Sequence, residues 1–211
     1  MMGIVNILLT VVFSYLVGAL PTAYLFGKVL KGVDIRQHGS GNIGATNAFR
    51  VLGKGPGAAV LIIDIVKGII AVVFIGNIFH QDTNGRILAA VAAVVGHNWT
   101  CFLNFKGGKG IATTLGVLIG LTIAIPVIRI AVFLCVLSWV ACFLITAYVS
   151  VSSILAAVLL PILMVVVSAP FSIDLLSILF CIFIVFRHRP NIQRLLKGQE
   201  SKVPLPFHRK N

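Results

Sequence analysis

Three polar segments interrupt an otherwise apolar chain, and their residue types suit the binding of phosphate. The first, residues 34–50, reads DIRQHGSGNIGATNAFR. Its glycines allow tight turns that bring backbone N–H groups close to a bound oxygen. These glycines are Gly39, Gly41 and Gly44, and the hydrogen-bonding side chains among and after them are Ser40, Asn42, Thr46 and Asn47. Arg50 adds a planar guanidinium that can hold phosphate with two donors, so we predict an anion site here.

The glycine spacing of this segment also fits two nucleotide-binding fingerprints, and both are rejected. The pattern G-x-G-x-x-G needs a preceding strand and a βαβ unit, and neither is indicated around Gly39–Gly44. A P-loop needs a lysine where this chain has Ala45. Dinucleotide and ATP binding therefore lose their main support.

The second segment, residues 96–110, reads GHNWTCFLNFKGGKG. Its last five residues, Lys106, Gly107, Gly108, Lys109 and Gly110, place two ammonium groups beside flexible backbone at the expected start of a helix. The N–H groups and the dipole of a helix N-terminus favour an anion, so this segment predicts a phosphate site. His97 lies shortly before it, either as a substrate contact or as a buried histidine satisfied by a neighbouring carbonyl.

The third segment, residues 187–200, reads RHRPNIQRLLKGQE. A basic end after the last membrane helix is common and means little alone. His188 and Asn191 are three residues apart, however, and share a face if the segment is helical. Glu200 is expected to hold neighbouring cations in place, which is a structural role.

The chain as a whole has the composition of an integral membrane protein. Hydrophobic residues make up 59% of its 211 residues, while only 17 Lys or Arg and 5 Asp or Glu are present. A water-facing surface needs about 25% charged residues, so the chain cannot cover one. The long apolar runs favour helices over a strand barrel. We expect an all-α membrane protein with about seven spans, over residues 4–26, 57–79, 87–103, 111–128, 130–149, 151–168 and 171–186.

The net charge of +12 reports orientation in the membrane rather than nucleic-acid binding. Fourteen of the 17 Lys and Arg residues fall in loops 27–56 and 104–110 and in the tail 187–211. We therefore expect these segments to be cytoplasmic, with the N-terminus outside and the C-terminus inside. The first helix lacks a basic leader and a cleavage site and is expected to be a retained anchor. Residues 1–211 are expected to form one multi-pass domain.

Few polar groups are expected within the spans. Asp64 and Lys67 lie three residues apart, either as a structural ion pair or in a role near a substrate. The four cysteines fall in apolar spans without paired spacing and are expected to be free, packed thiols. No His, Cys or carboxylate grouping suits a metal, and we expect neither a metal nor a cofactor.

Together, the three segments resemble signature blocks of one family, the bacterial acyl-phosphate:glycerol-3-phosphate acyltransferases of the PlsY type. The blocks are 39–47 with Arg50, 96–97 with 105–110, and His188 with 191–195 and 198–200, in the same order along the chain. Ser150 and Ser153 resemble a lesser block. The resemblance covers residues 14–200.

The resemblance implies transfer of a fatty acyl group from acyl phosphate to the sn-1 hydroxyl of glycerol 3-phosphate at the cytoplasmic face of the bacterial inner membrane. The products are lysophosphatidic acid and inorganic phosphate, in bacterial phospholipid biosynthesis. It implies that the reaction centre is formed by Ser40, Arg50, Lys109, His188 and Asn191. The glycines and polar residues of the first two blocks, with His97, Lys106 and Ser150, are expected to bind substrate. Whether a soluble enzyme that makes acyl phosphate docks to the basic face is left open.

Acyl phosphate is a mixed anhydride with a good leaving group, so direct transfer without an enzyme nucleophile is preferred. A covalent intermediate on Ser40 is the minor alternative. The proton acceptor is left open among His188, His97 and a substrate phosphate oxygen. The His-x4-Asp dyad of CoA-dependent acyltransferases is absent, since Ile43, Phe102 and Gln193 follow the candidate histidines at that distance.

Two other classes of protein remain as alternatives. A transporter or channel for a phosphorylated metabolite could use the same glycine loops, but the predicted anion sites all lie on one face of the membrane. A lipid-binding scaffold would explain scattered cations but not two glycine-spaced loops. The enzyme is therefore the preferred interpretation.

Overall fold

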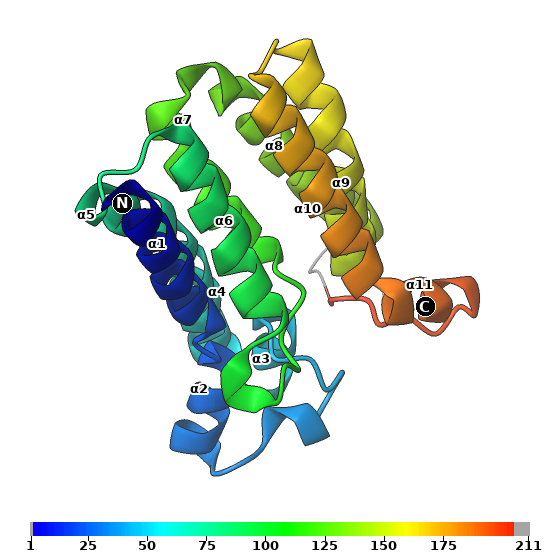
Figure 1. Cartoon of the computed structure of the whole chain (residues 1–211). Helices are drawn as coiled ribbons and strands as arrows, with labels where there is room; N and C mark the ends of the chain where they lie inside the picture. The colour runs from blue at the N-terminus through cyan, green and yellow to red at the C-terminus, as the bar shows by residue number, and fades with distance from the viewer. Residues whose placement is uncertain (1, 205–211) are drawn as a thin grey trace. The chain divides into compact units, whose positions relative to one another are not determined.

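The computed structural model describes residues 2–204, and every regular element within them is a helix (Figure 1). The chain divides into two compact units, Met1–Pro126 and Val127–Asn211, and each is described by itself. The expected single domain over residues 1–211 stays a prediction. The last part of the predicted basic tail, residues 205–211, lies outside the described residues.

The first unit contains seven α-helices. They are α1 (Met2–Ala19), α2 (Thr22–Lys31), α3 (Ala45–Leu52), α4 (Lys54–Ile70), α5 (Gly76–Ile78), α6 (Thr83–Asn98) and α7 (Ile111–Ala124). A π-helical segment, Ala71–Ile75, joins α4 to α5, and 3-10 turns lie at Ile35–Gln37 and Cys101–Leu103. A further 3-10 turn, Pro126–Ile128, spans the boundary between the units.

The second unit contains four helices: α8 (Arg129–Thr146), α9 (Val149–Val166), α10 (Phe171–Arg187) and α11 (Arg189–Leu196). α9 packs against both α8 and α10. α11 follows α10 after a bend of 55°. Pro190 lies in the first turn of α11, where its missing N–H costs no helical hydrogen bond.

Small residues let the helices of the first unit approach closely. α1 packs on α6, and α4 packs on α7. A side chain at Gly18 would collide with the backbone of Ala93, and one at Gly116 would collide with the backbone of Ile65. Membrane helices commonly associate through such small residues because packing, rather than water exclusion, holds them together.

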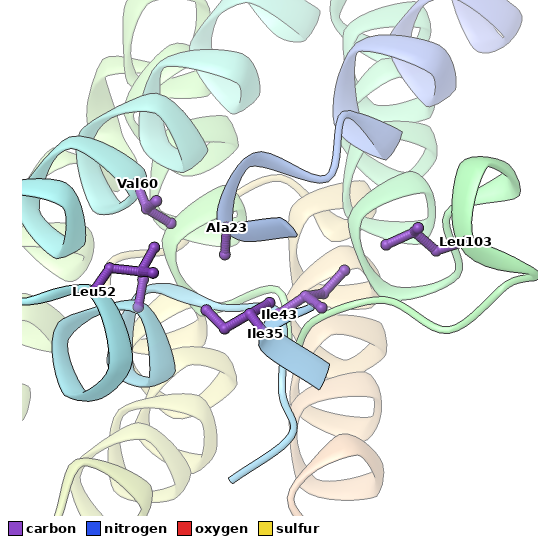
Figure 2. Packing of buried hydrophobic residues seen from close by; sticks show 7 residues of the cluster. Ala23, Ile35, Ile43, Leu52, Val60 and Leu103 are labelled. Carbon is purple, nitrogen blue, oxygen red and sulfur yellow. The ribbon is translucent and has the colours of Figure 1, made fainter. Parts of the chain in front are cut away.

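A buried hydrophobic cluster supports the polar end of the first unit (Figure 2). Its members are Ala23, Ile35, Ile43, Ala48, Leu52, Val60 and Leu103. Ile35 precedes the glycines of the first segment and Ile43 lies among them, while Leu103 precedes the glycines of the second. The cluster therefore places both predicted phosphate-binding segments beside one packed core.

Five helical segments of the described chain are long and apolar enough to cross a membrane: Gly3–Lys31, Lys54–Ile78, Thr83–Leu103, Pro126–Thr146 and Val149–Val166. A sixth is obtained if the bent pair α10 and α11 counts as one span, and α7 is a shorter apolar helix. The all-helical membrane class is confirmed. The count of seven and the orientation of the termini stay predictions.

The structure corrects three details. The expected first span is broken at Leu20–Pro21, and α2 continues to Lys31. The expected loop 27–56 therefore begins later, and it contains the helix α3 as well as a 3-10 turn. All four cysteines are free, as expected, but Cys101 is exposed because it begins a 3-10 turn after α6.

Candidate active site

The first glycine-rich segment, residues 38–47, forms a loop held by one buried carboxamide; we call it the glycine loop. Asn47 donates from Nδ2 to the carbonyls of Ile35 at 3.2 Å and His38 at 3.0 Å. Its Oδ1 accepts from the backbone N–H of Ser40 at 2.9 Å. Because both ends of this fully buried carboxamide are engaged, Asn47 holds the loop in shape.

Two positions in the glycine loop require glycine. Gly39 and Gly41 have φ values of 59° and 70°, in the left-handed region that most side chains avoid. A side chain at Gly39 would also collide with Oδ1 of Asn47. The chain can therefore turn sharply around Ser40, which is exposed.

The glycine loop ends at the N-terminus of α3. Gly44 is the N-cap residue and has no capping side chain, and the first turn contains no acidic residue. The first backbone N–H groups of a helix lack helical partners and attract anions. Asn42 and Thr46 are half-buried near this end, while Arg50 is exposed in the last turn of α3.

The one acidic side chain of residues 34–50 is already paired with a neighbour. Asp34 accepts hydrogen bonds from the Arg36 guanidinium, the shortest at 2.6 Å. These bonds hold the pKa of Asp34 at about 2, well below its ordinary value. The carboxylate thus carries its charge at neutral pH against Arg36, within the 3-10 turn that it caps.

The second segment folds back onto the end of α6; we call residues 106–110 the lysine-glycine loop. The backbone N–H of Gly107 donates to the carbonyl of Asn98 at 3.1 Å, and that of Gly108 donates to the carbonyl of His97 at 2.9 Å. Gly110 has φ of 78° and is the N-cap of α7. This loop, too, therefore delivers its cations to the start of a helix without acidic residues in the first turn.

Glycine is required in the lysine-glycine loop by close contacts. A side chain at Gly107 would meet the backbone carbonyls of His97 and Asn98, and one at Gly108 would meet the imidazole of His97. Lys106 is exposed and Lys109 is half-buried. Gly107 and Gly108 thus pack tightly against the end of α6, while the ammonium groups of the loop belong to Lys106 and Lys109.

His97 and the Asp64–Lys67 pair form one buried group. The Lys67 Nζ lies 2.8 Å from Oδ1 of Asp64 and 2.8 Å from Nδ1 of His97. The predicted pairing of Asp64 with Lys67 is confirmed. Its link to His97, which lies against the lysine-glycine loop, was not anticipated from the sequence.

In the second unit, three residues of the third segment are tied together near the start of α11. Glu200 accepts from Nδ2 of Asn191 at 2.6 Å and from Nε of Arg194 at 2.7 Å, while its structural role stays a prediction. Partial burial alone would raise the pKa of Glu200, but these hydrogen bonds outweigh it and hold the pKa below its ordinary value. Asn191 is thereby fixed at the start of α11.

His188 lies between α10 and α11 and is buried. Its Nδ1 is 2.8 Å from the carbonyl oxygen of Ile184. A carbonyl can only accept, so we assign the proton to Nδ1, which makes Nε2 the acceptor nitrogen of the neutral ring. Ser150, the lesser predicted residue, is buried in the first turn of α9.

Comparison with known proteins decides the family. A family model described as "Glycerol-3-phosphate acyltransferase" matches residues 8–198. The chain belongs to this family. The resemblance based on the three polar segments is confirmed.

The matches to known relatives cover nearly the whole length of this chain. A glycerol-3-phosphate acyltransferase of Fusobacterium nucleatum is 42% identical over 91% of this chain and 95% of its own. One of Halalkalibacterium halodurans is 44% identical over 92% of this chain and 94% of its own.

Two crystal structures of PlsY (YgiH), described as an integral membrane glycerol 3-phosphate acyltransferase, are similar to this chain. The glycerol 3-phosphate form has a TM-score of 0.85 at 37% identity and covers 94% of this chain and 96% of that chain. The lysophosphatidic acid form has a TM-score of 0.82 at 36% identity, over 94% and 95% of the two chains. These likenesses support a multi-pass membrane acyltransferase.

The predicted site residues of the acyltransferase fall into two groups, one in each unit. In the first unit, the hydrophobic cluster places the glycine loop and the lysine-glycine loop in the same region. In the second unit, Asn191 and Glu200 are in direct contact, and His188 immediately precedes their helix. That both groups serve one reaction centre stays a prediction.

Proposed function

We propose that the protein transfers a fatty acyl group from acyl phosphate to the sn-1 hydroxyl of glycerol 3-phosphate. The products are lysophosphatidic acid and inorganic phosphate, in bacterial phospholipid biosynthesis. One observation carries the proposal. In a member of this family, the glycine loop and the lysine-glycine loop flank one hydrophobic cluster, and each loop ends at a helix N-terminus and is accompanied by cations. Two such loops suit a reaction in which both substrates carry phosphate.

The lysine-glycine loop is the proposed site for the phosphate of glycerol 3-phosphate. Its half-buried Lys109 and exposed Lys106 supply charge, and the first N–H groups of α7 supply directional donors. The glycine loop, with Ser40 and Arg50, is proposed to hold the acyl phosphate. A planar guanidinium can neutralise a departing phosphate with two parallel hydrogen bonds.

The proposed step is direct acyl transfer. The hydroxyl oxygen of glycerol 3-phosphate attacks the acyl carbonyl carbon and forms the new ester bond. The bond between this carbon and the phosphate oxygen breaks, the electron pair leaves with phosphate, and a base takes the hydroxyl proton. Ser40 and Asn191 are proposed to polarise the carbonyl, while Arg50 and Lys109 stabilise the phosphate charge.

The hydrogen bonds of the two buried histidines favour His188 over His97 as the proton acceptor. Nε2 of His188 is assigned as an acceptor nitrogen because Nδ1 faces a carbonyl. Nδ1 of His97 faces the Lys67 ammonium, which can only donate, so that nitrogen is already occupied as an acceptor. A phosphate oxygen of the substrate remains the competing base.

We further propose that the reaction takes place at the cytoplasmic face of the bacterial inner membrane, with the N-terminus outside and the C-terminus inside. The concentration of 14 of the 17 Lys and Arg residues in the segments expected to be cytoplasmic supports this orientation. The acyl chain would lie among the helices and the phosphates at their polar ends.

The experiment that tests the function offers three donors to the purified protein. Labelled glycerol 3-phosphate is supplied with acyl phosphate, acyl-CoA or acyl carrier protein carrying the same chain, and the lipid product is isolated. Product from acyl phosphate alone, with the acyl group at the sn-1 position, is the expected result. Product from either thioester would overturn the proposed donor, and a 2-acyl product would overturn the proposed position.

A further inference from the structure

Four buried polar side chains of the first unit form a cluster against the lysine-glycine loop. They come from α2, α4 and α6, and they are Thr22, Asp64, Lys67 and His97. None is more than 6% exposed. Burying an ion pair among apolar helices is costly unless its hydrogen-bonding groups are satisfied. Such a cluster needs either a structural or a functional explanation.

The Lys67 ammonium uses three acceptors, which is the number of its N–H groups. They are Oδ1 of Asp64 at 2.8 Å, the carbonyl of Leu20 at 3.1 Å and Nδ1 of His97 at 2.8 Å. Oδ1 of Asp64 also accepts from the hydroxyl of Thr22 at 3.1 Å. The ammonium is therefore held by a carboxylate on its own helix and by a carbonyl at the break between α1 and α2.

The protonation of His97 can be assigned from this arrangement. An ammonium has no lone pair, so Nδ1 of His97 must be the acceptor in this contact. A doubly protonated ring would place an N–H against the ammonium, and an Nδ1–H tautomer would require a neutral lysine beside the Asp64 carboxylate. With Lys67 charged, we therefore assign His97 as the neutral tautomer with its proton on Nε2.

The Nε2 edge of the ring lies against the lysine-glycine loop. A side chain added at Gly108 would meet Nε2 of His97 first, and the carbonyl of His97 accepts from the N–H of Gly108 at 2.9 Å. His97 thus contacts the loop through both its ring and its backbone. Fixing the ring also limits the positions that Gly108 can take.

We propose that Lys67, oriented by Asp64, is a positioning residue for acyl-acceptor binding: it holds His97 as the Nε2–H tautomer, which presents a donor to the lysine-glycine loop and keeps that loop in its phosphate-binding shape. This inference rests on the proposed binding of glycerol 3-phosphate by the loop. It also assigns His97 to binding rather than to proton removal, because the nitrogen nearest the loop carries a proton.

A purely structural pair would behave differently. Removing it would lower the stability of the whole unit and reduce the apparent turnover in proportion to the loss of folded protein, with KM for both substrates unchanged. A positioning pair acts on one substrate. Its removal raises KM for glycerol 3-phosphate while KM for acyl phosphate is retained.

The first test reads the tautomer directly in the full-length protein. Histidine is labelled with ¹⁵N, and the His97 signals are assigned by their loss in His97→Asn. The expected spectrum at neutral pH shows a protonated Nε2 and an unprotonated Nδ1. A proton on Nδ1, alone or on both nitrogens, would overturn the inference without any reference to activity.

The second test compares loss of the cation on α4 that contacts His97 with loss of a cation near the opposite end of α6. Asp64→Asn with Lys67→Met removes both charges together, so that no buried charge is left unpaired. Arg86→Met is the matched control, because Arg86 also donates to a backbone carbonyl, that of Val72, but lies near the opposite end of α6 from His97. Thermal unfolding and recovery from the membrane report folding for both.

The double variant is expected to raise KM for glycerol 3-phosphate about tenfold, which corresponds to about 1.4 kcal/mol. Turnover should change less than KM, and hydrogen exchange at the Gly107 and Gly108 amides should become faster. The Arg86→Met control should retain the wild-type KM for glycerol 3-phosphate and the wild-type rate of hydrogen exchange. An unchanged KM in a folded double variant would overturn the inference while leaving the proposed function intact, whereas wild-type protein that uses no glycerol 3-phosphate would overturn the function itself. If the double variant does not fold, the wild-type tautomer alone decides.

Discussion

Oδ1 of Asn47 accepts a hydrogen bond from the backbone N–H of Ser40 at 2.9 Å, while Nδ2 of the same side chain holds two carbonyls of the preceding segment. One carboxamide thus fixes the turn that presents Ser40. Its loss would leave three backbone groups without these partners, each at a cost of about 1–3 kcal/mol where water does not replace them.

Asn47→Ala is therefore expected to lower turnover by at least about a hundredfold, since displacement of a reacting group by about 1 Å can have an effect of this size. The protein should still insert in the membrane, because the hydrophobic spans are unchanged. Gln37→Ala is the matched control: it removes an exposed amide from the same segment and should retain activity. Equal activity of both variants would show that the loop does not depend on Asn47.

The family and the apolar helices could be predicted from the sequence because motifs and apolar runs are local signals. It did not predict α3, whose eight residues lie in a polar stretch and pack through Ala48 and Leu52 on a cluster assembled from distant segments. The break at Pro21 was missed because apolar residues continue on both sides of it. The contact between Lys67 and His97 joins residues 30 positions apart, so no local pattern reports it.

Alanine at Gly107 or Gly108 should raise KM for glycerol 3-phosphate more than it lowers turnover, if the loop binds this phosphate equally in the ground and transition states. The size of the effect on KM should differ between the two positions. A side chain at Gly107 meets fixed backbone, whereas one at Gly108 meets a ring that can shift, so Gly107→Ala should have the larger effect. Gly55→Ala is the control, because nothing lies within 4 Å of an added Cβ there. An unchanged KM in both loop variants would remove the loop from substrate binding.

Arg50→Ala and Lys109→Ala should each nearly abolish acyl transfer while leaving the protein in the membrane. The reason is the loss of charge stabilisation on a departing or bound phosphate. Lys54→Ala removes an exposed cation close to Arg50 and should retain near-normal activity, which separates a specific contact from the general positive potential. Transfer assays on membranes with matched protein amounts give the comparison. Activity near wild type in Arg50→Ala or Lys109→Ala would mean that the site lies elsewhere.

Glu200 gives a prediction on the pH dependence of stability. Its pKa is held below the ordinary value of 4.5, so the charged form is favoured in the folded state. The stabilisation of the folded state by the charged Glu200 is fully present above pH 4.5 and is lost as the pH falls through the lower folded pKa. Glu200→Gln should therefore lower the unfolding temperature at pH 7 by about 2–4 °C, for a contribution of about 1 kcal/mol.

The difference between wild type and Glu200→Gln should narrow as the pH falls from 4.5 through the lower folded pKa of Glu200, because both side chains are neutral once Glu200 is protonated. Thermal unfolding in detergent at a series of pH values measures it. A difference that stays constant or widens toward acid would contradict the assigned hydrogen bonds to Asn191 and Arg194.

His188→Asn separates the two candidate bases. The amide of asparagine can replace the Nδ1 donor toward the carbonyl of Ile184, but it supplies no counterpart of Nε2. If Nε2 accepts the hydroxyl proton, turnover should fall by about 10²–10⁴ with little change in either KM. His80→Asn is the control, because His80 is exposed and has φ of 51°, a left-handed conformation that asparagine tolerates. Retained turnover in His188→Asn would assign proton removal to a phosphate oxygen of the substrate, and the role of His188 would then be to bind the acyl phosphate or to orient Asn191.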